Sequence, residues 1–132
     1  MQYEPTLNRA ELISLATKSY FGSVDKKDME ATLACFNDEA LFCVQTAFTR
    51  HAGKDEICRM FEDFFGAWKT IVHKDFVCTV DEKNGRITAS FEAVLTAEDG
   101  SVTQFFNTNF WRIRDGKFQE VYVYFSGENV LV

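Results

Sequence analysis

The sequence predicts an α+β domain in which three helices come first and a curved antiparallel sheet follows. Apolar residues recur at helical spacing as far as residue 68, and after Ile71 they alternate with a period of two. The alternating segments are separated by the short turns EKNG, AEDG and RDG, each ending in the glycine that a tight hairpin needs. Strands joined so closely must be antiparallel neighbours, and helices that precede them are expected to cover one face of the sheet.

Composition is typical of one globular domain spanning residues 1–132. The chain is 46% hydrophobic and 26% charged, which is enough apolar material for a real core. It contains 14 Phe and only one Pro. So many apolar rings indicate either a large aromatic core or an aromatic-lined cavity.

The net charge of −6 argues against two classes of partner. Nucleic acids and anionic membrane surfaces are bound by clustered Lys and Arg, and the sequence has no such cluster. The opening MQYEPTLNRAEL lacks the basic and apolar regions of a secretory signal, so we expect a cytoplasmic protein. The four cysteines lack metal-ligand spacing, so we expect them to be reduced, buried thiols that form neither a disulfide nor a zinc site.

Helical signals fill the first half of the chain. Asn8 and Glu11 have the spacing of a capping box, so the first helix is expected to begin there and to end at Gly22 and Ser23. Asp25 is the predicted cap of a second helix, which stops before residues 37–38. A short strand at residues 40–46 and a loop at 49–53 then lead to a third helix at residues 54–68.

Four strands are predicted after this helix, at residues 73–81, 86–96, 102–114 and 117–125. Alternation divides the last two strands into two aromatic faces. A homodimer that packs face to face would cover the outer aromatics, whereas a monomer would leave them scattered on its surface. The residues predicted to form this dimer face are Phe106, Phe110, Tyr122 and Tyr124.

The stretches SVDKKDMEATLACFNDEALF, HAGKDEI and NFWRIRDGKFQEVYVYFSG resemble the nuclear transport factor 2-like superfamily, and within it the SnoaL-like and ketosteroid-isomerase-like branch. The resemblance extends from about Asn8 to Gly127. It implies a cystatin-like cone, with three N-terminal helices on the concave face of a curved, mainly antiparallel sheet. It also implies a pocket for a small apolar or carbonyl ligand. The activity would be that of a cofactor-independent isomerase, cyclase or dehydratase; the alternative is a non-catalytic dimerisation or accessory module.

Of the catalytic positions that the resemblance implies, some carry a suitable residue in this sequence and others do not. Tyr20 falls where the isomerases have their oxyanion tyrosine, and Asn109 falls at or near their oxyanion acid. Val44 occupies the position of the isomerase base, and Ser126 stands about where the SnoaL cyclases have their Asp. Neither residue is a usual base, so the resemblance implies a non-standard one.

Three residues are candidates for catalysis: Tyr20, Asn109 and His51, the last because its loop could overhang the pocket opening. The candidate ligand-binding residues are Val44, Phe61, Phe65, Trp68, Phe91, Asn107, Trp111, Val123 and Phe125. Gln45 is also expected to face the hollow, and His73 is interpreted as a surface or capping residue.

Overall fold

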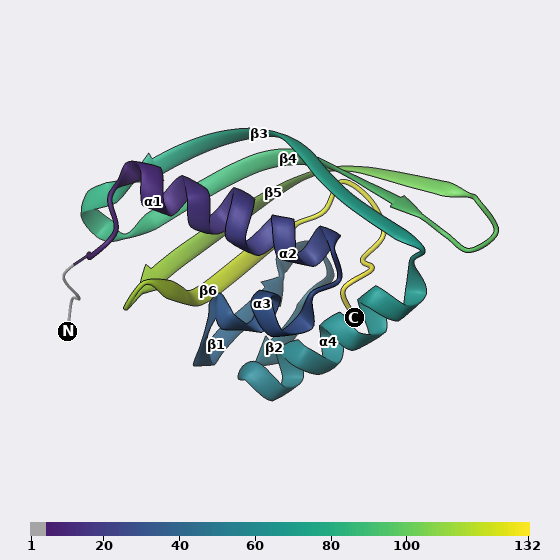
Figure 1. Ribbon diagram of the computed structural model, residues 1–132, viewed down its shortest axis with the longest axis horizontal. Helices are drawn as coiled ribbons and strands as arrows, with labels where there is room; N and C mark the ends of the chain where they lie inside the picture. The colour runs from purple at the N-terminus through teal and green to yellow at the C-terminus, as the bar shows by residue number, and fades with distance from the viewer. Residues whose placement is uncertain (1–4) are drawn as a thin grey trace.

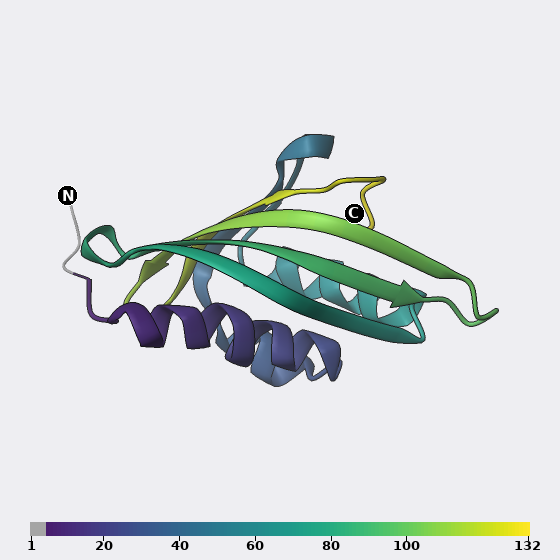
Figure 2. The ribbon, with the colours of Figure 1, turned by 90° about the horizontal axis from the view of Figure 1, so that it is seen from above.

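A layer of helices covers the concave face of a curved six-stranded sheet in the computed structural model, which describes residues 5–132 (Figures 1 and 2). The predicted α+β class is confirmed, because the helices precede most of the sheet and pack on one side of it. The long first helix lies across the strands β3 and β4, and a second, shorter helical layer lies beside it (Figure 1).

The first helical rod consists of α1 (Arg9–Ser14), a π-helical turn η1 (Leu15–Tyr20) and α2 (Phe21–Asp25). The predicted capping box is present: Asn8 Oδ1 accepts from Glu11 N at 2.9 Å, and Glu11 Oε1 accepts from Asn8 N at 3.0 Å. The predicted end at Gly22 and Ser23 is wrong. The helix continues because Phe21 and Val24 bury their side chains under it.

The predicted cap of the second helix is displaced by three residues. Lys27 turns the chain with a φ of 56°, and Asp28 then caps α3 (Met29–Ala34) by accepting from Ala31 N at 3.1 Å. Asp25 is therefore no cap. It is the last residue of α2, and its carboxylate is free to reach strand β3.

The segment after α3 is more extended than predicted. Strand β1 (Phe36–Val44) begins four residues early, and the turn η2 (Gln45–Ala47) leaves Gln45 exposed and outside the hollow. The expected loop at residues 49–53 contains β2 (Thr49–Ala52), which pairs antiparallel with β1. This strand is short and mostly polar, so it lacks the alternation of apolar residues from which a strand is predicted. Helix α4 (Lys54–Ala67) follows as predicted.

The predicted meander is confirmed, with one addition. Strands β3 (Thr70–Asp81), β4 (Arg86–Thr96), β5 (Val102–Arg114) and β6 (Lys117–Tyr124) pair antiparallel in sequence order, and the turn η3 (Glu82–Asn84) joins the first two. The full order is β2-β1-β6-β5-β4-β3, in which β1 pairs parallel with β6. That long-range pairing extends the sheet beyond the meander, beside α3 and α4 (Figure 1).

The alternation in β5 correctly divides its two faces. Asn107, Asn109 and Trp111 are buried on the concave side, whereas Phe106 and Phe110 are exposed on the convex side. The buried aromatic rings pack edge to face or tilted against one another around Tyr20, an arrangement that stabilises aromatic cores.

All four cysteines are free thiols, with Cys35 and Cys43 buried. Within residues 5–132 no group of three or more His, Cys, Asp or Glu side chains is placed to hold a metal ion. Across the same range, every helix is too short or too polar to cross a membrane.

Replacing Asn8 with alanine tests the capping box. We expect the free energy of unfolding to fall by about 1 kcal/mol, because the first turn loses the acceptor for its orphan amide. Urea denaturation monitored by tryptophan fluorescence measures this loss. Thr6→Ala, a neighbouring exposed substitution, is the control, and an equal effect of both substitutions would contradict the capping role.

Candidate functional site

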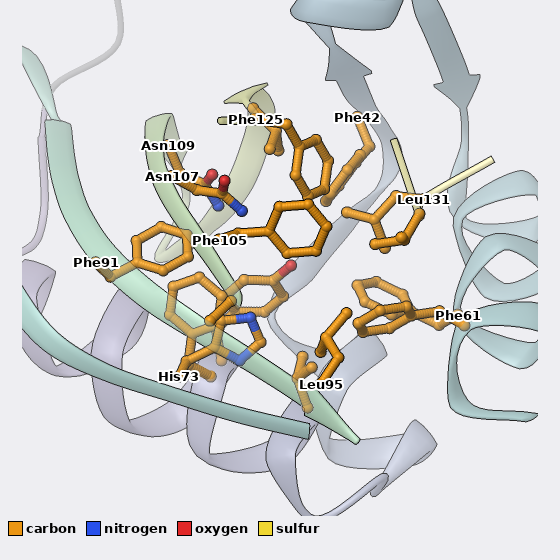
Figure 3. Close-up of a pocket in the computed structure, with 17 residues that line it drawn as sticks. Phe42, Phe61, His73, Phe91, Leu95, Phe105, Asn107, Asn109, Phe125 and Leu131 are labelled. Carbon is orange, nitrogen blue, oxygen red and sulfur yellow. The ribbon is translucent and has the colours of Figure 1, made fainter. Parts of the chain in front are cut away.

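A small aromatic cavity lies between the helical rod, α4 and the concave face of the sheet (Figure 3). The space open to the centre of a water-sized sphere is about 30 Å³. Since one ordered water needs roughly 10–15 Å³ of such space, the void accommodates about two waters. Its walls are Tyr20, Phe21, Val24, Phe42, Phe61, Phe64, His73, Phe91, Ala93, Leu95, Phe105, Asn107, Asn109, Val123, Phe125, Val130 and Leu131.

The cavity wall contains a histidine that is held by a carboxylate. His73 Nδ1 lies 2.6 Å from Asp25 Oδ1, and His73 N donates to Asp25 Oδ2 at 2.8 Å. One carboxylate therefore binds both the backbone and the ring of the same residue. The side chains are 8% and 24% exposed, so the pair is largely shielded from water.

The geometry also fixes which ring nitrogen is available. Because an ionised carboxylate only accepts hydrogen bonds, Nδ1 carries a proton, and in the neutral ring Nε2 keeps its lone pair. Phe21 stacks on the imidazole with ring centroids 4.2 Å apart, which restrains its rotation. His73 Nε2 has no hydrogen-bonding partner among residues 5–132. An oriented imidazole with a free nitrogen at a cavity is the arrangement of a general base.

Tyr20 supplies a hydroxyl at the end of the π-helical turn, a type of helix irregularity that is frequent at functional sites. Its side chain is buried among Phe36, Phe61 and Phe118. Burial raises the pKa of Tyr20 far above its usual value, and the Cys35 thiol and the Asp25 carboxylate raise it further. The phenol therefore stays protonated and can donate a hydrogen bond.

Two amides complete the polar part of the cavity. Asn107 Oδ1 accepts from Ser126 N at 3.1 Å, which leaves its NH₂ group without a partner in the described part of the chain. Asn109 is buried, and its Oδ1 has no hydrogen-bonding partner among residues 5–132. Figure 3 shows both amides beside Phe91, on the side of the cavity occupied by His73. Unpaired buried amides are costly, and a bound molecule or water would satisfy them.

The structure places the sequence candidates in two groups. Tyr20, Asn109 and five of the proposed ligand-binding residues line the cavity; those five are Phe61, Phe91, Asn107, Val123 and Phe125. The remaining four candidates are packed in or against the core outside the lining: Val44, Phe65, Trp68 and Trp111. Trp111 stacks on Phe118, and Val44 pairs with Thr49 and Val123 in the sheet, so both act as structural neighbours of the cavity.

His51 does not reach the cavity. It lies on β2 and is buried, with Nε2 3.1 Å from Leu131 O and Nδ1 3.3 Å from Arg59 Nη2. Ser126 also has a structural contact, because its Oγ accepts from Phe106 N at 2.9 Å. Neither side chain is part of the polar group formed by Tyr20 and His73.

Sequence reasoning missed the Asp25–His73 pair. The two residues are 48 positions apart, so no local motif connects them. Their positions contain one weak signal: His73 shares its strand parity with the buried Ile71, which predicts that its side chain faces the helices. Asp25 resembled a helix cap, and that interpretation concealed its role as an acceptor for His73.

Comparison with known proteins identifies a family for most of this architecture. Residues 17–121, well over half of the chain, match the SnoaL-like domain family. No curated protein matches the sequence.

Solved structures share the fold at low identity. A proposed polyketide cyclase from Xanthomonas campestris has a TM-score of 0.79 at 18% identity, covering 89% of this chain and 92% of that protein. A proposed isomerase from Bacillus subtilis has a TM-score of 0.80 at 16% identity, covering 91% and 90%. An LEH-like epoxide hydrolase from M. tuberculosis has a TM-score of 0.76 at 15% identity, covering 89% and 84%. At these identities the likeness establishes the fold.

Replacing Tyr20 with phenylalanine tests the buried phenol. Above pH 10 the unfolded chain loses the tyrosine proton while the folded protein keeps it, so stability falls as pH rises. Between pH 8 and pH 10.5, this residue alone should lower the free energy of unfolding of the native protein by about 0.8 kcal/mol. Tyr20→Phe should not show this loss. Urea denaturation at the two pH values measures the difference. Tyr124→Phe, on the exposed face, is the hydroxyl-deletion control, and identical pH slopes for native protein and Tyr20→Phe would contradict the burial argument.

Proposed function

Starting from the membership of this chain in the SnoaL-like domain family, we propose that its cavity binds a small carbonyl compound and moves a proton at the carbon beside the carbonyl group. The observation that carries the proposal is the Asp25–His73 pair on the cavity wall. It supplies a base at a position unrelated to Val44 and Ser126, where the family resemblance led us to look for one.

The proton transfer begins at His73. Its Nε2 lone pair takes a proton from the α-carbon of the ligand, and the electrons of that C–H bond move to the carbonyl oxygen. The ring becomes an imidazolium, which the Asp25 carboxylate stabilises at 2.6 Å from Nδ1. If His73 returns this proton to a different carbon, the reaction is an isomerisation. If it gives the proton to a leaving hydroxyl group, the reaction is a dehydration.

Hydrogen-bond donors in the cavity match the charge that this step creates. The Tyr20 hydroxyl stays protonated because of its burial, and the NH₂ group of Asn107 has no partner in the part of the chain that the structure describes. Donors of this kind stabilise an enolate oxygen strongly where water is excluded. The apolar rings around these donors exclude water from the cavity. In this proposal the base and the donors are all side chains of the protein.

The size of the void limits the ligand. About 30 Å³ holds waters and no ring, so a carbonyl compound of ordinary size must displace wall side chains when it binds. We therefore expect a compact apolar ligand, with most of its surface against phenylalanine and with its oxygen toward Tyr20.

Deuterium incorporation provides the test of the chemistry. A panel of small cyclic ketones and enones is incubated with the protein in D₂O, and loss of the α-proton signal is followed by ¹H NMR. Removing the base with His73→Gln should lower the exchange rate roughly 10²–10⁴-fold. Asp25→Asn should lower the rate as well, because an amide no longer holds the ring tautomer.

Asp38→Asn is the matched control, since it removes an exposed carboxylate that pairs with Lys54 away from the cavity. Its exchange rate should equal that of the native protein. Exchange that persists in His73→Gln at the native rate would eliminate His73 as the base. A native protein that exchanges none of the ketones and enones would count against carbonyl chemistry altogether.

A second part of the proposal concerns the convex face of the sheet. Phe106, Phe110 and Tyr124 are 65%, 45% and 42% exposed there, and Phe110 contacts Tyr124 with ring centroids 5.6 Å apart. Tyr122 lies beside them and donates to Glu120 at 2.7 Å. Clustered aromatics of this kind are typical of an interface, so we infer a homodimer that packs through this face.

Phe110→Lys tests the dimer by placing a charge in the centre of that face. Sedimentation velocity should show a dimer for the native protein and a monomer for Phe110→Lys, since the lysine would be desolvated in the interface. Ser19→Lys, on the exposed side of the helical rod, adds the same charge and should remain dimeric. A native protein that sediments as a monomer at all concentrations would refute the homodimer.

A further inference from the structure

We propose that residues 125–132, here called the strap, form a gate over the cavity in which Leu131 is the plug and His51 with Arg59 is the latch. The inference rests on the proposed function in one respect, namely that this cavity is the ligand site. It assigns a role to His51, which lies outside the cavity and has no part in the chemistry.

The near end of the strap is attached to the cavity wall. Where β6 ends at Tyr124, Phe125 N donates to Thr46 Oγ1 at 3.2 Å. Ser126 N then donates to Asn107 Oδ1 at 3.1 Å, so a residue that lines the cavity also anchors the strap. This end acts as a hinge, because its hydrogen bonds join it to the turn η2 and to strand β5.

The far end is held by a latch of two side chains. Arg59 Nη2 lies 3.3 Å from His51 Nδ1, and a guanidinium can only donate. The proton of the neutral His51 ring is therefore on Nε2, which donates to Leu131 O at 3.1 Å. Arg59 Nη1 also donates to Val132 O at 3.2 Å. Both contacts are made to the strap backbone by elements outside the strap.

Leu131 fills the space that the latch closes. Its side chain is buried and lines the cavity together with Val130 and Phe125. Figure 3 shows Leu131 on the side of the cavity opposite Phe91 and His73, close to Phe42 and Phe61. The plug therefore faces the polar groups across the void. Leu131 limits the ligand length that the closed cavity accepts.

The strap is the part of the wall with the weakest attachment. It has no helix or strand over residues 125–132, so side-chain contacts and isolated hydrogen bonds hold it. The cavity side chains on β4 and β5 belong to strands that are paired on both sides. Segments that lack a hydrogen-bonded ladder open at lower free energy than core strands. Opening of the strap is thus the least costly route by which the void can admit a ring.

Native-state hydrogen exchange tests the gate directly. The amide of Leu131 reports on the closed strap, because this residue is buried when the strap is closed and opening exposes it to water, although its hydrogen bond to Asn129 Oδ1 at 2.9 Å lies within the strap. Arg59→Met keeps the apolar stem but removes the hydrogen bond to Val132 O and the donor that fixes the His51 tautomer, so the Leu131 amide should exchange about tenfold faster. The amides of β4 and β5 should keep their native exchange rates. Lys54→Met, which removes another cation of α4, is the matched control and should leave the strap unchanged.

Entry of a probe tests whether ligands pass through the gate. Leu95→Ala enlarges the cavity from a strand while the strap stays latched, and indole is the probe. Indole should bind Leu95→Ala slowly, and the added Arg59→Met substitution should speed its binding about tenfold, measured by NMR exchange at the Val123 methyl groups.

Two results would overturn the gate. One is a Leu131 amide that exchanges together with the β4 and β5 amides, in the native protein and in Arg59→Met alike. The other is indole binding that is absent, or that is equally fast in Leu95→Ala with and without Arg59→Met. Failure of the ketone exchange with both gate results positive would refute the proposed chemistry and leave the gate standing.

Discussion

The carboxylate of Asp25 is the contact on which the site depends. As the last residue of α2, it lies at the negative end of the helix, where a second negative charge is unfavourable. Two donors from His73, the backbone N–H at 2.8 Å and the ring at 2.6 Å, offset this cost. The pair ties the helical rod to the edge strand β3 and orients the imidazole toward the cavity. An acidic residue at the C-terminal end of a helix is locally unfavourable, and such departures from local preference are common at functional sites.

The rest of the cavity is consistent with this arrangement. A buried phenol and two amides lie among phenylalanine rings, where each unpaired polar group lowers stability. A ligand oxygen would satisfy these groups, and the void is small enough that water alone can occupy it before the strap opens. In the function that we propose, the apolar lining, the donors and the oriented base serve a single event: the capture of a compact carbonyl compound away from solvent.

Local signals predicted most of the fold. The capping box at Asn8 and the glycine-ended turns are short-range patterns, and the alternation in β5 placed Asn107 and Asn109 on the concave face. The parallel pairing of β1 with β6 was not predictable in this way, because it joins distant segments. Strand β2 was not predicted, because its four mostly polar residues show no alternation of apolar and polar side chains.

The candidate site was predicted less completely than the fold. The amides of β5 and the apolar residues Val123 and Phe125 followed from strand parity, and Tyr20 followed from the family resemblance, whereas lining residues such as Phe42 and Leu131 were not predicted. The partnership of Asp25 with His73 is a tertiary contact, and the proposed latch role of His51 depends on Arg59, eight residues later, and on Leu131, 80 residues later. Histidine and aspartate have many structural uses, so their identity alone does not select one of them.

The tautomer of His73 tests the central claim most directly. Long-range ¹H–¹⁵N correlation spectra of the protein at pH 8 distinguish the two ring nitrogens. The structure predicts a ring that is protonated at Nδ1, where it donates to Asp25, and unprotonated at Nε2. In Asp25→Asn this preference should weaken. A native ring that carries its proton on Nε2 would contradict the account, because its lone pair would then be on Nδ1, against Asp25, and out of reach of a ligand.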